Sequence, residues 1–424
     1  MGFFNKQVRE NNLSHGINTY VLPTSVKDIV TISGSFLGGT LYSPTNNPQI
    51  STLTAAMLDK GTTNQNKYEI SDALDSVGAE LRFGNTRHHI YFTGHCLTNN
   101  INMVIDILTE QLRAPAFIDD EINKLKTRML GKLDQSLEDT KKQALISFLR
   151  SLYPKNHPNY RYKTSETISF IKNINQTDLQ SFHDLTYGLN TMNIAIAGDV
   201  DPESFNDHII NKFGDWKKQS LNEIDAKIKS KLPVNNVEKI NIEDKTSADM
   251  YLGQPIGIDR DHDDYYPLML GVYILGGNFS ARLMQTVRDE QGLTYGIGSS
   301  IGGSSFGADG YWSTWGTFSP DLIEKGQRST LDQINKWYEN GVHEDELNSK
   351  KSTITGSYKV ALDTTSGLVS KILSNAERAR PVSYLDEYVG IINNISLDQI
   401  NNAISKYIDP NKLTIVCAGS FNNK

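Results

Sequence analysis

The chain carries an internal repeat, and this repeat restricts the fold more than any other feature of the sequence. "NTMNIAIAG" (Asn190–Gly198) resembles "NKLTIVCAG" (Asn411–Gly419), 221 positions later. "DDEINKLK" from Asp119 resembles "EDELNSKK" from Glu344, 225 positions later. The units of a solenoid are far shorter than this spacing, so the repeat indicates duplicated domains. We predict a first domain, a polar linker and a homologous second domain at residues 1–218, 219–248 and 249–424.

Apolar residues within the first copy follow two different periods. Residues 28–39 ("DIVTISGSFLGG") alternate like a half-buried strand, and residues 82–96 also have strand character. Residues 66–80 and 100–112 have helical spacing instead. A long helix is expected from Asp119, with an apolar stripe at Ile122, Leu125, Met129, Leu133 and Leu137. This mixture predicts the α+β class, in which each domain has a largely antiparallel sheet with helices packed on one face.

The composition argues against several classes of function. The formal net charge is −7 and no extended Lys/Arg run occurs, which disfavours a nucleic-acid-binding surface. No stretch approaches the roughly 18 apolar residues of a membrane span. Cys96 and Cys417 are the only cysteines in the sequence. Two cysteines are too few for a Cys-rich zinc site, and they do not indicate the redox compartment. We therefore expect a globular protein without a nucleic-acid partner or a membrane span.

Several further segments occur in an order that resembles one known family. They are "AAMLDKGT" from Ala55, "LRAPAFIDDEI" from Leu112, "IAIAGDVDPESF" from Ile194, "FGDWKK" from Phe213 and "SARLMQTVRDEQGLTYGIGSS" from Ser280. Together they resemble the insulinase–pitrilysin zinc peptidases, the inverzincins, whose signature is H-x-x-E-H. The resemblance covers nearly the whole chain. It implies an insulinase-like fold, similar to that of the mitochondrial processing peptidases.

The zinc motif of that family is missing from this chain. In active relatives two histidines at i and i+4 bind zinc, the glutamate at i+3 activates water, and a distant glutamate completes the metal shell. The register of "MLDKGT" places Thr52 and Ala56 at the histidines, Ala55 at the general base and Lys132 at the distant glutamate. No H-x-x-E-H or H-x-x-x-H occurs elsewhere in the sequence. Since alanine offers no lone pair and lysine repels Zn²⁺, we predict no metal and no peptide cleavage by this chain alone.

The second copy retains two residues that the resemblance connects with substrate binding. Arg288 and Tyr295 stand at the spacing at which the family carries an Arg and a Tyr that hydrogen-bond the substrate main chain. We expect Ser280 to begin the helix that carries Arg288 and Gly292 to end it. A structural explanation stays open, in which Arg288 offsets the helix macrodipole and Tyr295 only packs.

Other segments permit narrower expectations. In a strand, His88 and His89 would point to opposite faces, and His95 would lie far from His89, so we expect no metal cluster there. Residues 275–283 lack the lysine and spacing of a phosphate-binding loop, and residues 299–312 are typical of a hairpin. In active relatives an edge strand near the zinc helix binds the substrate, and residues 29–39 are the candidate here.

These observations favour a non-catalytic subunit or half of an insulinase-family metallopeptidase. Such a chain completes the substrate chamber, contacts peptide and depends on a zinc-bearing partner, in a heterodimer or a longer fused chain. Two alternatives stay open: a metal-free structural or assembly protein, and an independent peptide-binding protein. Long-chain bacterial relatives are usually exported, which favours the periplasm after removal of a signal, but the sequence itself does not identify the compartment, the partner or the substrate.

Overall fold

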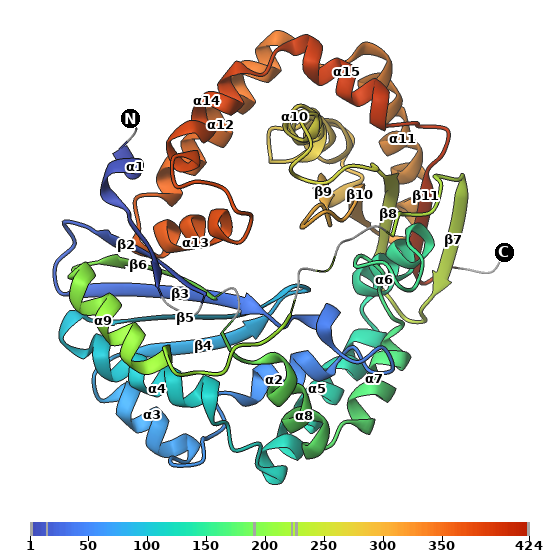
Figure 1. Cartoon of the computed structure of the whole chain (residues 1–424). Coiled ribbons are helices and arrows are strands. Elements are labelled where there is room, and N and C mark those ends of the chain that lie inside the picture. Colours follow the sequence, from blue (N-terminus) through green and yellow to red (C-terminus); the bar gives the residue numbers. More distant parts are fainter. Residues whose placement is uncertain (1–2, 14–15, 190–191, 222–223, 225–227, 422–424) are drawn as a thin grey trace. The chain divides into compact units, whose positions relative to one another are not determined.

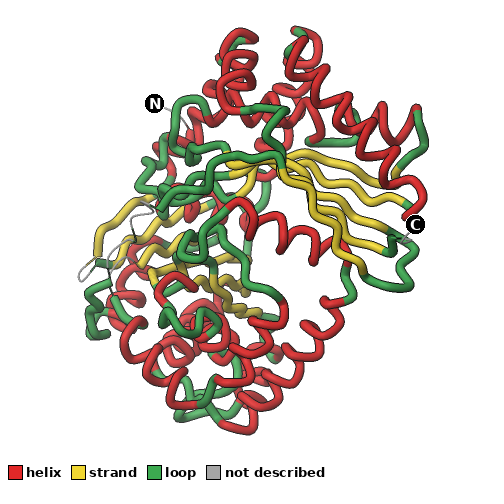
Figure 2. The backbone as a smooth tube through the Cα atoms, turned by 90° about the vertical axis from the view of Figure 1, so that its right-hand side faces the viewer, coloured by secondary structure: helices red, strands yellow, loops and turns green. Residues whose placement is uncertain are grey.

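The computed structural model describes residues 3–13, 16–189, 192–221, 224 and 228–421. Its strands form two separate sheets (Figures 1 and 2). The first sheet has the order β1 (Arg9–Leu13), β2 (Ile17–Pro23), β6 (Met192–Gly198), β3 (Ile29–Leu37), β5 (His89–Leu97) and β4 (Glu80–Asn85). The second has the order β7 (Asn236–Asn241), β11 (Thr414–Gly419), β8 (Ala248–Pro255), β10 (Tyr311–Phe318) and β9 (Thr294–Gly302).

The two sheets share one topology. From β2 to β4 in the first and from β7 to β9 in the second, one parallel pair is followed by three antiparallel pairs. The parallel pairs are β2 with β6 and β7 with β11. This correspondence confirms the α+β fold with two homologous sheets that the repeat predicts.

Helices follow the strands in both copies. In the first copy they are α1 (Phe3–Gln7), α2 (Ile50–Met57), α3 (Lys67–Asp75), α4 (Ile101–Arg113), α5 (Asp119–Leu137), α6 (Thr140–Leu152), α7 (Thr164–Asn173), α8 (Gln176–Thr186) and α9 (Pro202–Phe213). In the second copy they are α10 (Tyr265–Gly276), α11 (Ile323–Asn340), α12 (Glu344–Ala361), α13 (Thr365–Ala376), α14 (Tyr384–Asn394) and α15 (Leu397–Tyr407). Single turns lie at Thr40–Tyr42, Thr98–Asn100 and Pro320–Leu322, and Met284–Glu290 (η3) is π-helical.

Local signals mark many helix ends. Asn66 and Glu69 form a capping box at the start of α3, and Ser396 with Gln399 forms another at the start of α15. In each box a side-chain oxygen accepts from backbone N–H groups that a helix leaves unpaired at its first turn. At α9, Asp201 accepts from the Ser204 amide. The sequence therefore determines these boundaries locally.

The chain divides into two compact units that do not follow the repeat. Unit 1 contains Met1–Leu130, Ile168–Ile224 and Ser357–Gly390, and unit 2 contains Gly131–Thr167, Asp225–Gly356 and Ile391–Lys424. Each unit therefore combines one sheet with helices from both copies. The domain boundaries inferred from the repeat, 1–218 and 249–424, stay a prediction about homology.

In unit 1 the first sheet is covered by a helix from the second copy. Leu368, Ile372 and neighbouring apolar residues of α13 pack on Leu22, Ala195 and Ala197. On the opposite face lie α4 and α9 (Figure 1), and the Thr19 hydroxyl donates to Asn206 of α9. Because helices cover both faces, β3 is buried from Val30 to Leu37. The expectation that residues 28–39 form a half-buried strand is therefore wrong.

In unit 2 the second sheet receives a helix from the first copy in the same way. Ala144, Phe148 and Leu152 lie one turn apart on α6 and pack in a cluster with Val416 and Ala418 of β11. Helix α11 covers the opposite face, where the rings of Trp337 and Trp312 lie 5.9 Å apart. Burying an aliphatic or aromatic side chain stabilises the fold by about 1.5–3 kcal/mol, so these exchanged helices contribute substantially to each unit.

The described part of the segment between the copies includes a β-strand. Residues 222–223 and 225–227 of the predicted linker lie outside the described residues. Asn236–Asn241 form β7, which pairs with β11. The Ser230 amide donates to the Asp309 carboxylate at 3.0 Å. Much of the described part of this segment therefore belongs to unit 2 and does not act as a free tether.

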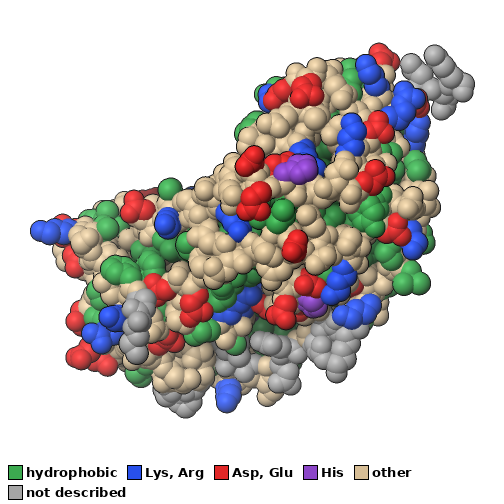
Figure 3. Space-filling view, turned by 90° about the horizontal axis from the view of Figure 1, so that it is seen from above, with side chains coloured by type: hydrophobic (Ala, Val, Ile, Leu, Met, Phe, Trp, Pro, Cys, Tyr) green, Lys and Arg blue, Asp and Glu red, His purple; other side chains and the backbone are tan. Residues whose placement is uncertain are grey.

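Charges are mixed on the surface. On the face seen in Figure 3, Lys and Arg side chains alternate with Asp and Glu side chains, without a broad basic area. Within the part of the chain that the structure describes, no helix has the length and apolar character needed to cross a membrane.

Candidate functional site

Helix α2 carries three of the four positions at which the family's zinc residues are replaced. Thr52 and Ala56, one turn apart, are half-buried, whereas Ala55 is only 1% exposed. The Thr52 hydroxyl accepts a hydrogen bond from Asn85 Nδ2 at 3.2 Å. Two methyl groups and one engaged hydroxyl do not provide the nitrogen, sulfur or carboxylate donors that zinc prefers. These residues do not fit a zinc ion.

Lys132 is the fourth position, and it lies on α5. Its side chain is exposed, and it belongs to the segment Gly131–Thr167 of unit 2, whereas α2 belongs to unit 1. That Lys132 converges with α2 stays a prediction. Across the described residues, no group of three His, Cys, Asp or Glu side chains is placed to hold a metal ion.

The prediction that residues 29–39 form an edge strand is wrong. Strand β3 pairs with β6 on one side and with β5 on the other, so residues 29–39 cannot accept a peptide as an added strand. Among the described residues, the sheet edge beside α2 is formed by β4, which pairs with β5 only. Asn85 at the end of β4 also donates to Ser51 Oγ at 3.1 Å. Strand β4 therefore has the position that the sequence analysis assigned to β3.

Arg288 and Tyr295 lie close together on the surface of unit 2. Arg288 stands on η3 with a side chain that is 33% exposed, and Tyr295 follows at the start of β9 with 88% exposure. The guanidinium carbon of Arg288 lies 5.7 Å from the centre of the Tyr295 ring, within the range of a cation–π contact. An exposed tyrosine of this kind contributes little to a core, which disfavours the explanation that it only packs.

The ends of η3 agree only in part with the sequence analysis. Gly292 has a φ of +60°, and the amides of Gly292 and Leu293 donate to the carbonyls of Arg288 and Val287. This left-handed ending confirms the predicted role of Gly292. Ser280 has another role than the predicted cap, because its hydroxyl accepts from Lys350 Nζ at 2.6 Å. π-Helical turns are rare and occur frequently at functional sites.

A third residue beside Arg288 was missed from the sequence. Phe279 is 78% exposed, and its ring centre lies 5.8 Å from the guanidinium carbon of Arg288. Arg288 therefore contacts two exposed aromatic rings, those of Phe279 and Tyr295. A bulky apolar residue next to the glycines of "LGGNFSARL" was the available signal, because a turn would be expected to project it into solvent.

Two cations anchor the segment around Phe279, Lys350 at the turn itself and Arg282 at the helix that follows. Lys350 of α12 is 4% exposed, and its ammonium donates to Asn278 Oδ1 at 3.1 Å and to the Ser280 carbonyl at 2.9 Å. Burial lowers the pKa of Lys350. Arg282 binds both oxygens of Glu346, at 2.7 and 2.6 Å. Burial by itself would raise the pKa of Glu346, but the hydrogen bond from Arg282 holds it below the usual value.

The histidines that the sequence offers as metal ligands lie in unit 1, away from Arg288 and Tyr295 in the chain. His88 and His89 are each 5% exposed, and burial lowers the pKa of each to about 4. Their ring centres are 6.3 Å apart, and His95 has an exposed side chain beside Glu80. His157, which the sequence analysis did not single out, is buried, and its Nε2 lies 2.7 Å from the Asp309 carboxylate.

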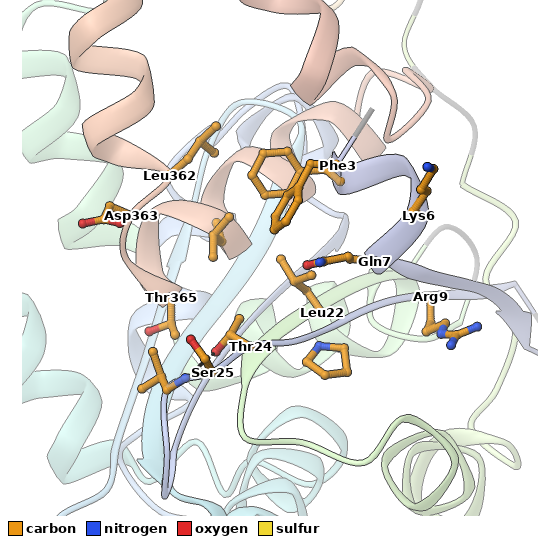
Figure 4. Close-up of a pocket in the computed structure, with 14 residues that line it drawn as sticks. Phe3, Lys6, Gln7, Arg9, Leu22, Thr24, Ser25, Leu362, Asp363 and Thr365 are labelled. Carbon is orange, nitrogen blue, oxygen red and sulfur yellow. Dashed lines mark hydrogen bonds between the residues drawn. The ribbon is translucent and has the colours of Figure 1, made fainter. Parts of the chain in front are cut away.

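Two remaining features do not involve the predicted site residues. Residues 299–312 span the turn between β9 and β10, with Gly303 and Gly307 at positive φ, which confirms the predicted hairpin. A cavity of about 620 Å³ in unit 1 lies between the N-terminal segment, the end of β2 and the start of α13 (Figure 4). Phe3, Lys6, Arg9, Leu22 and Asp363 are among the residues that line it.

Comparisons with known proteins support the family resemblance. The family model described as insulinase (peptidase family M16) matches residues 20–159, and the one described as peptidase M16 inactive domain matches residues 173–354. The non-peptidase homolog YmxG of Helicobacter pylori is 25% identical over 90% of this chain and 86% of its own length. The uncharacterized zinc protease YmxG of Bacillus subtilis is 23% identical over 81% of this chain and 82% of its own length.

Solved structures support the same fold. The crystal structure of a peptidase M16 inactive domain from Pseudomonas fluorescens has a TM-score of 0.88 and 23% identity, and the match covers 97% of this chain and 98% of that one. The periplasmic protease PqqL of Escherichia coli has a TM-score of 0.81 and 12% identity, with 98% of this chain matching 46% of that one. The two family models together match most of the sequence, and the site lacks the residues of a zinc centre. The chain therefore belongs to the insulinase family, peptidase family M16, as an inactive homologue within it.

Proposed function

We propose that this chain is the non-catalytic subunit, or half, of an insulinase-family metallopeptidase. It completes the substrate chamber of a zinc-bearing partner and contacts the peptide there. The observation that carries the proposal is the exposed pair Arg288 and Tyr295, in a chain with Thr52, Ala55, Ala56 and Lys132 at the metal and base positions. The match to 46% of a longer periplasmic protease agrees with a half of this kind.

The chemistry of the pair suits an extended peptide. Arg288 offers a rigid set of N–H donors, and Tyr295 offers a hydroxyl on a stiff arm. Donors of this kind bind a backbone carbonyl and stabilise negative charge that develops on its oxygen. The zinc that would activate the attacking water belongs to the partner. The role of this chain is to bind and orient the peptide and to help exclude water.

Strand β4 gives the peptide a second place to bind. No strand of the described chain pairs with its outer edge, so an extended segment can add to β4 through backbone hydrogen bonds. The strand is short, from Glu80 to Asn85, and Asn85 connects it to α2 through Ser51 and Thr52. Addition of a strand recognises the peptide main chain more than its sequence, which fits a chamber that accepts unfolded segments.

The test is reconstitution with a zinc-bearing, H-x-x-E-H insulinase subunit from the same organism. Cleavage of an internally quenched peptide is expected from the mixture and not from this chain alone, and metal analysis should find zinc in the partner only. Arg288→Ala and Tyr295→Phe should lower kcat/KM of the pair by about 10²-fold, as loss of an oxyanion donor does. Arg128→Ala and Tyr68→Phe, which change an exposed arginine and an exposed tyrosine elsewhere, are the matched controls.

The outcomes separate the possible functions. A reconstituted pair that is indifferent to both Arg288→Ala and Tyr295→Phe would remove the proposed site. Zinc and peptidase activity in this chain alone would overturn the non-catalytic assignment. Stable association with another complex that has no peptidase would favour the structural alternative, and tight peptide binding without any partner would favour an independent peptide-binding protein.

A further inference from the structure

We infer that Phe279 is a specificity-determining residue of the Arg288–Tyr295 site, and that Lys350 positions it. The site then selects extended peptides that carry a large apolar or aromatic side chain beside the carbonyl bound by Arg288. This inference rests on the proposed function, because it assumes that Arg288 and Tyr295 contact peptide. It adds a residue, a substrate class and a positioning group to that site.

Phe279 occupies the corner of a tight turn. The Ala281 amide donates to the Asn278 carbonyl at 3.1 Å, so Phe279 and Ser280 are the two central residues of this turn. The turn follows directly after α10 and leads into η3. Phe279 keeps 78% of its surface exposed, whereas most large apolar side chains of unit 2 are buried. An exposed phenylalanine beside a site residue presents free apolar surface for a ligand.

The two rings flank one cation. The guanidinium carbon of Arg288 lies 5.8 Å from the Phe279 ring centre and 5.7 Å from the Tyr295 ring centre. Its ion pair with Asp289 is long, at 3.4 Å between Nη1 and Oδ1. Two ring contacts therefore restrict where the guanidinium lies, while its N–H groups stay available for a carbonyl. A peptide carbonyl at Arg288 brings the adjacent side chain to the exposed rings.

Lys350 anchors the turn through Asn278 and Ser280, the residues on either side of Phe279. Its ammonium donates to Asn278 Oδ1, to the Ser280 carbonyl and to Ser280 Oγ at 3.1, 2.9 and 2.6 Å. All three donors of the ammonium are thus used within one turn. Lys350 is 4% exposed, and removing its charge from water costs free energy. The three hydrogen bonds offset this desolvation cost only while they stay formed. The turn is therefore rigid, which a specificity residue requires.

The first experiment measures peptide preference by isothermal titration calorimetry, with this chain in complex with a zinc-bearing partner whose general-base Glu is changed to Gln, so that the peptide is bound but not cleaved. The probes are two blocked peptides of about ten Gly, Ser and Asn residues that differ only in a central Phe or a central Ser. The wild-type chain should bind the Phe peptide about fivefold more tightly, the value of one aromatic pair. Phe279→Ala should abolish this preference with less than about twofold change for the Ser peptide, and Phe279→Trp should keep it. Phe3→Ala, which changes another exposed phenylalanine, should behave as wild type.

The second experiment separates positioning from general stability. Lys350→Met should remove the Phe preference while leaving binding of the Ser peptide within about twofold, and Lys350→Arg should restore part of the preference. Ser280→Ala deletes the shortest of the three bonds and also the 3.3 Å bond from Ser280 Oγ to Asn278 Oδ1, and it should have an intermediate effect. A purely structural lysine would lower the thermal midpoint in Lys350→Met and leave the preference unchanged.

The results distinguish this inference from the proposed function. If Phe279→Ala keeps the wild-type preference while Arg288→Ala weakens binding of both peptides, the inference is wrong and the proposed function stands. If Arg288→Ala and Tyr295→Phe bind both peptides as the wild type does, the proposed site itself is wrong. A wild-type chain that binds neither peptide, or both equally, also overturns the inference.

Discussion

Asp309 lies at the centre of a buried hydrogen-bond network that holds unit 2 together. Its Oδ1 lies 2.7 Å from His157 Nε2, and its Oδ2 accepts from the Ser230 amide at 3.0 Å. The backbone N–H of Asn159 donates to His157 Nδ1. Nδ1 is therefore the unprotonated nitrogen, and Nε2 carries the hydrogen that is donated to Asp309. Tyr153 donates to the Asp309 carbonyl and stacks on His157 with ring centres 4.2 Å apart. The network thus joins a segment of the first copy to the second.

Asp309→Asn is the perturbation that tests this network. The new amide keeps the shape of the carboxyl group, but only one of its two ends accepts a hydrogen bond. Its NH₂ group must face one of two N–H donors, His157 Nε2–H or the Ser230 backbone N–H. A switch of His157 to its other tautomer would not relieve this, because the Nδ1–H would then face the backbone N–H of Asn159. Losing one bond to a charged acceptor and leaving a buried donor unpaired should lower the free energy of unfolding by about 3 kcal/mol.

Urea unfolding followed by tryptophan fluorescence gives the measurement. Trp312, Trp315 and Trp337 belong to unit 2 and Trp216 to unit 1, so the signal reports mainly on unit 2. With a slope of about 2–3 kcal/mol per molar urea, the midpoint should fall by about 1 M. Asp332→Asn removes the same charge from an exposed position of α11 and is the control. Equal midpoints for Asp309→Asn and Asp332→Asn would refute the reasoning.

The pH dependence gives an independent check on Asp309. Burial by itself would raise its pKa, but hydrogen bonds from His157 and Ser230 hold the pKa below the usual value. A carboxylate with a lowered pKa stabilises the fold above its unfolded pKa of about 4, and this contribution disappears as the pH falls through the folded-state pKa. The difference between wild type and Asp309→Asn should therefore be constant from neutral pH to about pH 5 and shrink below about pH 4.

Two further predictions concern unit 1. Burial raises the pKa of Glu377, so its charged form destabilises the fold at neutral pH. Glu377→Gln should therefore raise the thermal midpoint at pH 7 but not below about pH 4, where the carboxyl group is neutral in both states. A lower midpoint at pH 7 would contradict this. Thr52→His/Ala56→His places two imidazoles one turn apart on α2, and zinc at about 100 times its Kd should then stabilise the variant by about 2.7 kcal/mol. Wild type should show no such shift in the same thermal titration, and equal shifts in both proteins would show that zinc binds elsewhere.

The repeat made the fold class predictable. Segments related by the two offsets fold into sheets of one topology, because similar apolar periods and turn signals recur in both copies. Local chemistry also determined the capping boxes at Asn66 and Ser396 and the left-handed ending at Gly292. The missing zinc residues could be read directly from residue types, since Thr, Ala and Lys lack the required donors in any arrangement.

Long-range pairing was not predictable from the same patterns. The apolar face of α13 shows that one side must be buried, but its 3.6-residue period does not say that the partner is the sheet of the other copy. The position of β3 at the centre of its sheet depends on backbone hydrogen bonds to β6 and β5, which leave no local mark in the sequence. Its burial on both faces followed from the helices that cover it.

The sequence by itself therefore determined the two-copy α+β architecture and the residue types at the family's metal positions, and its family resemblance supplied the candidates Arg288 and Tyr295. Only the tertiary structure decided which sheet each of α6 and α13 covers, which strand has a free edge beside α2, and that Phe279 stands against Arg288. The physical reason is that residue type and local period set what a segment can bury or bind, whereas its partner is selected by packing and backbone pairing between segments far apart in the chain.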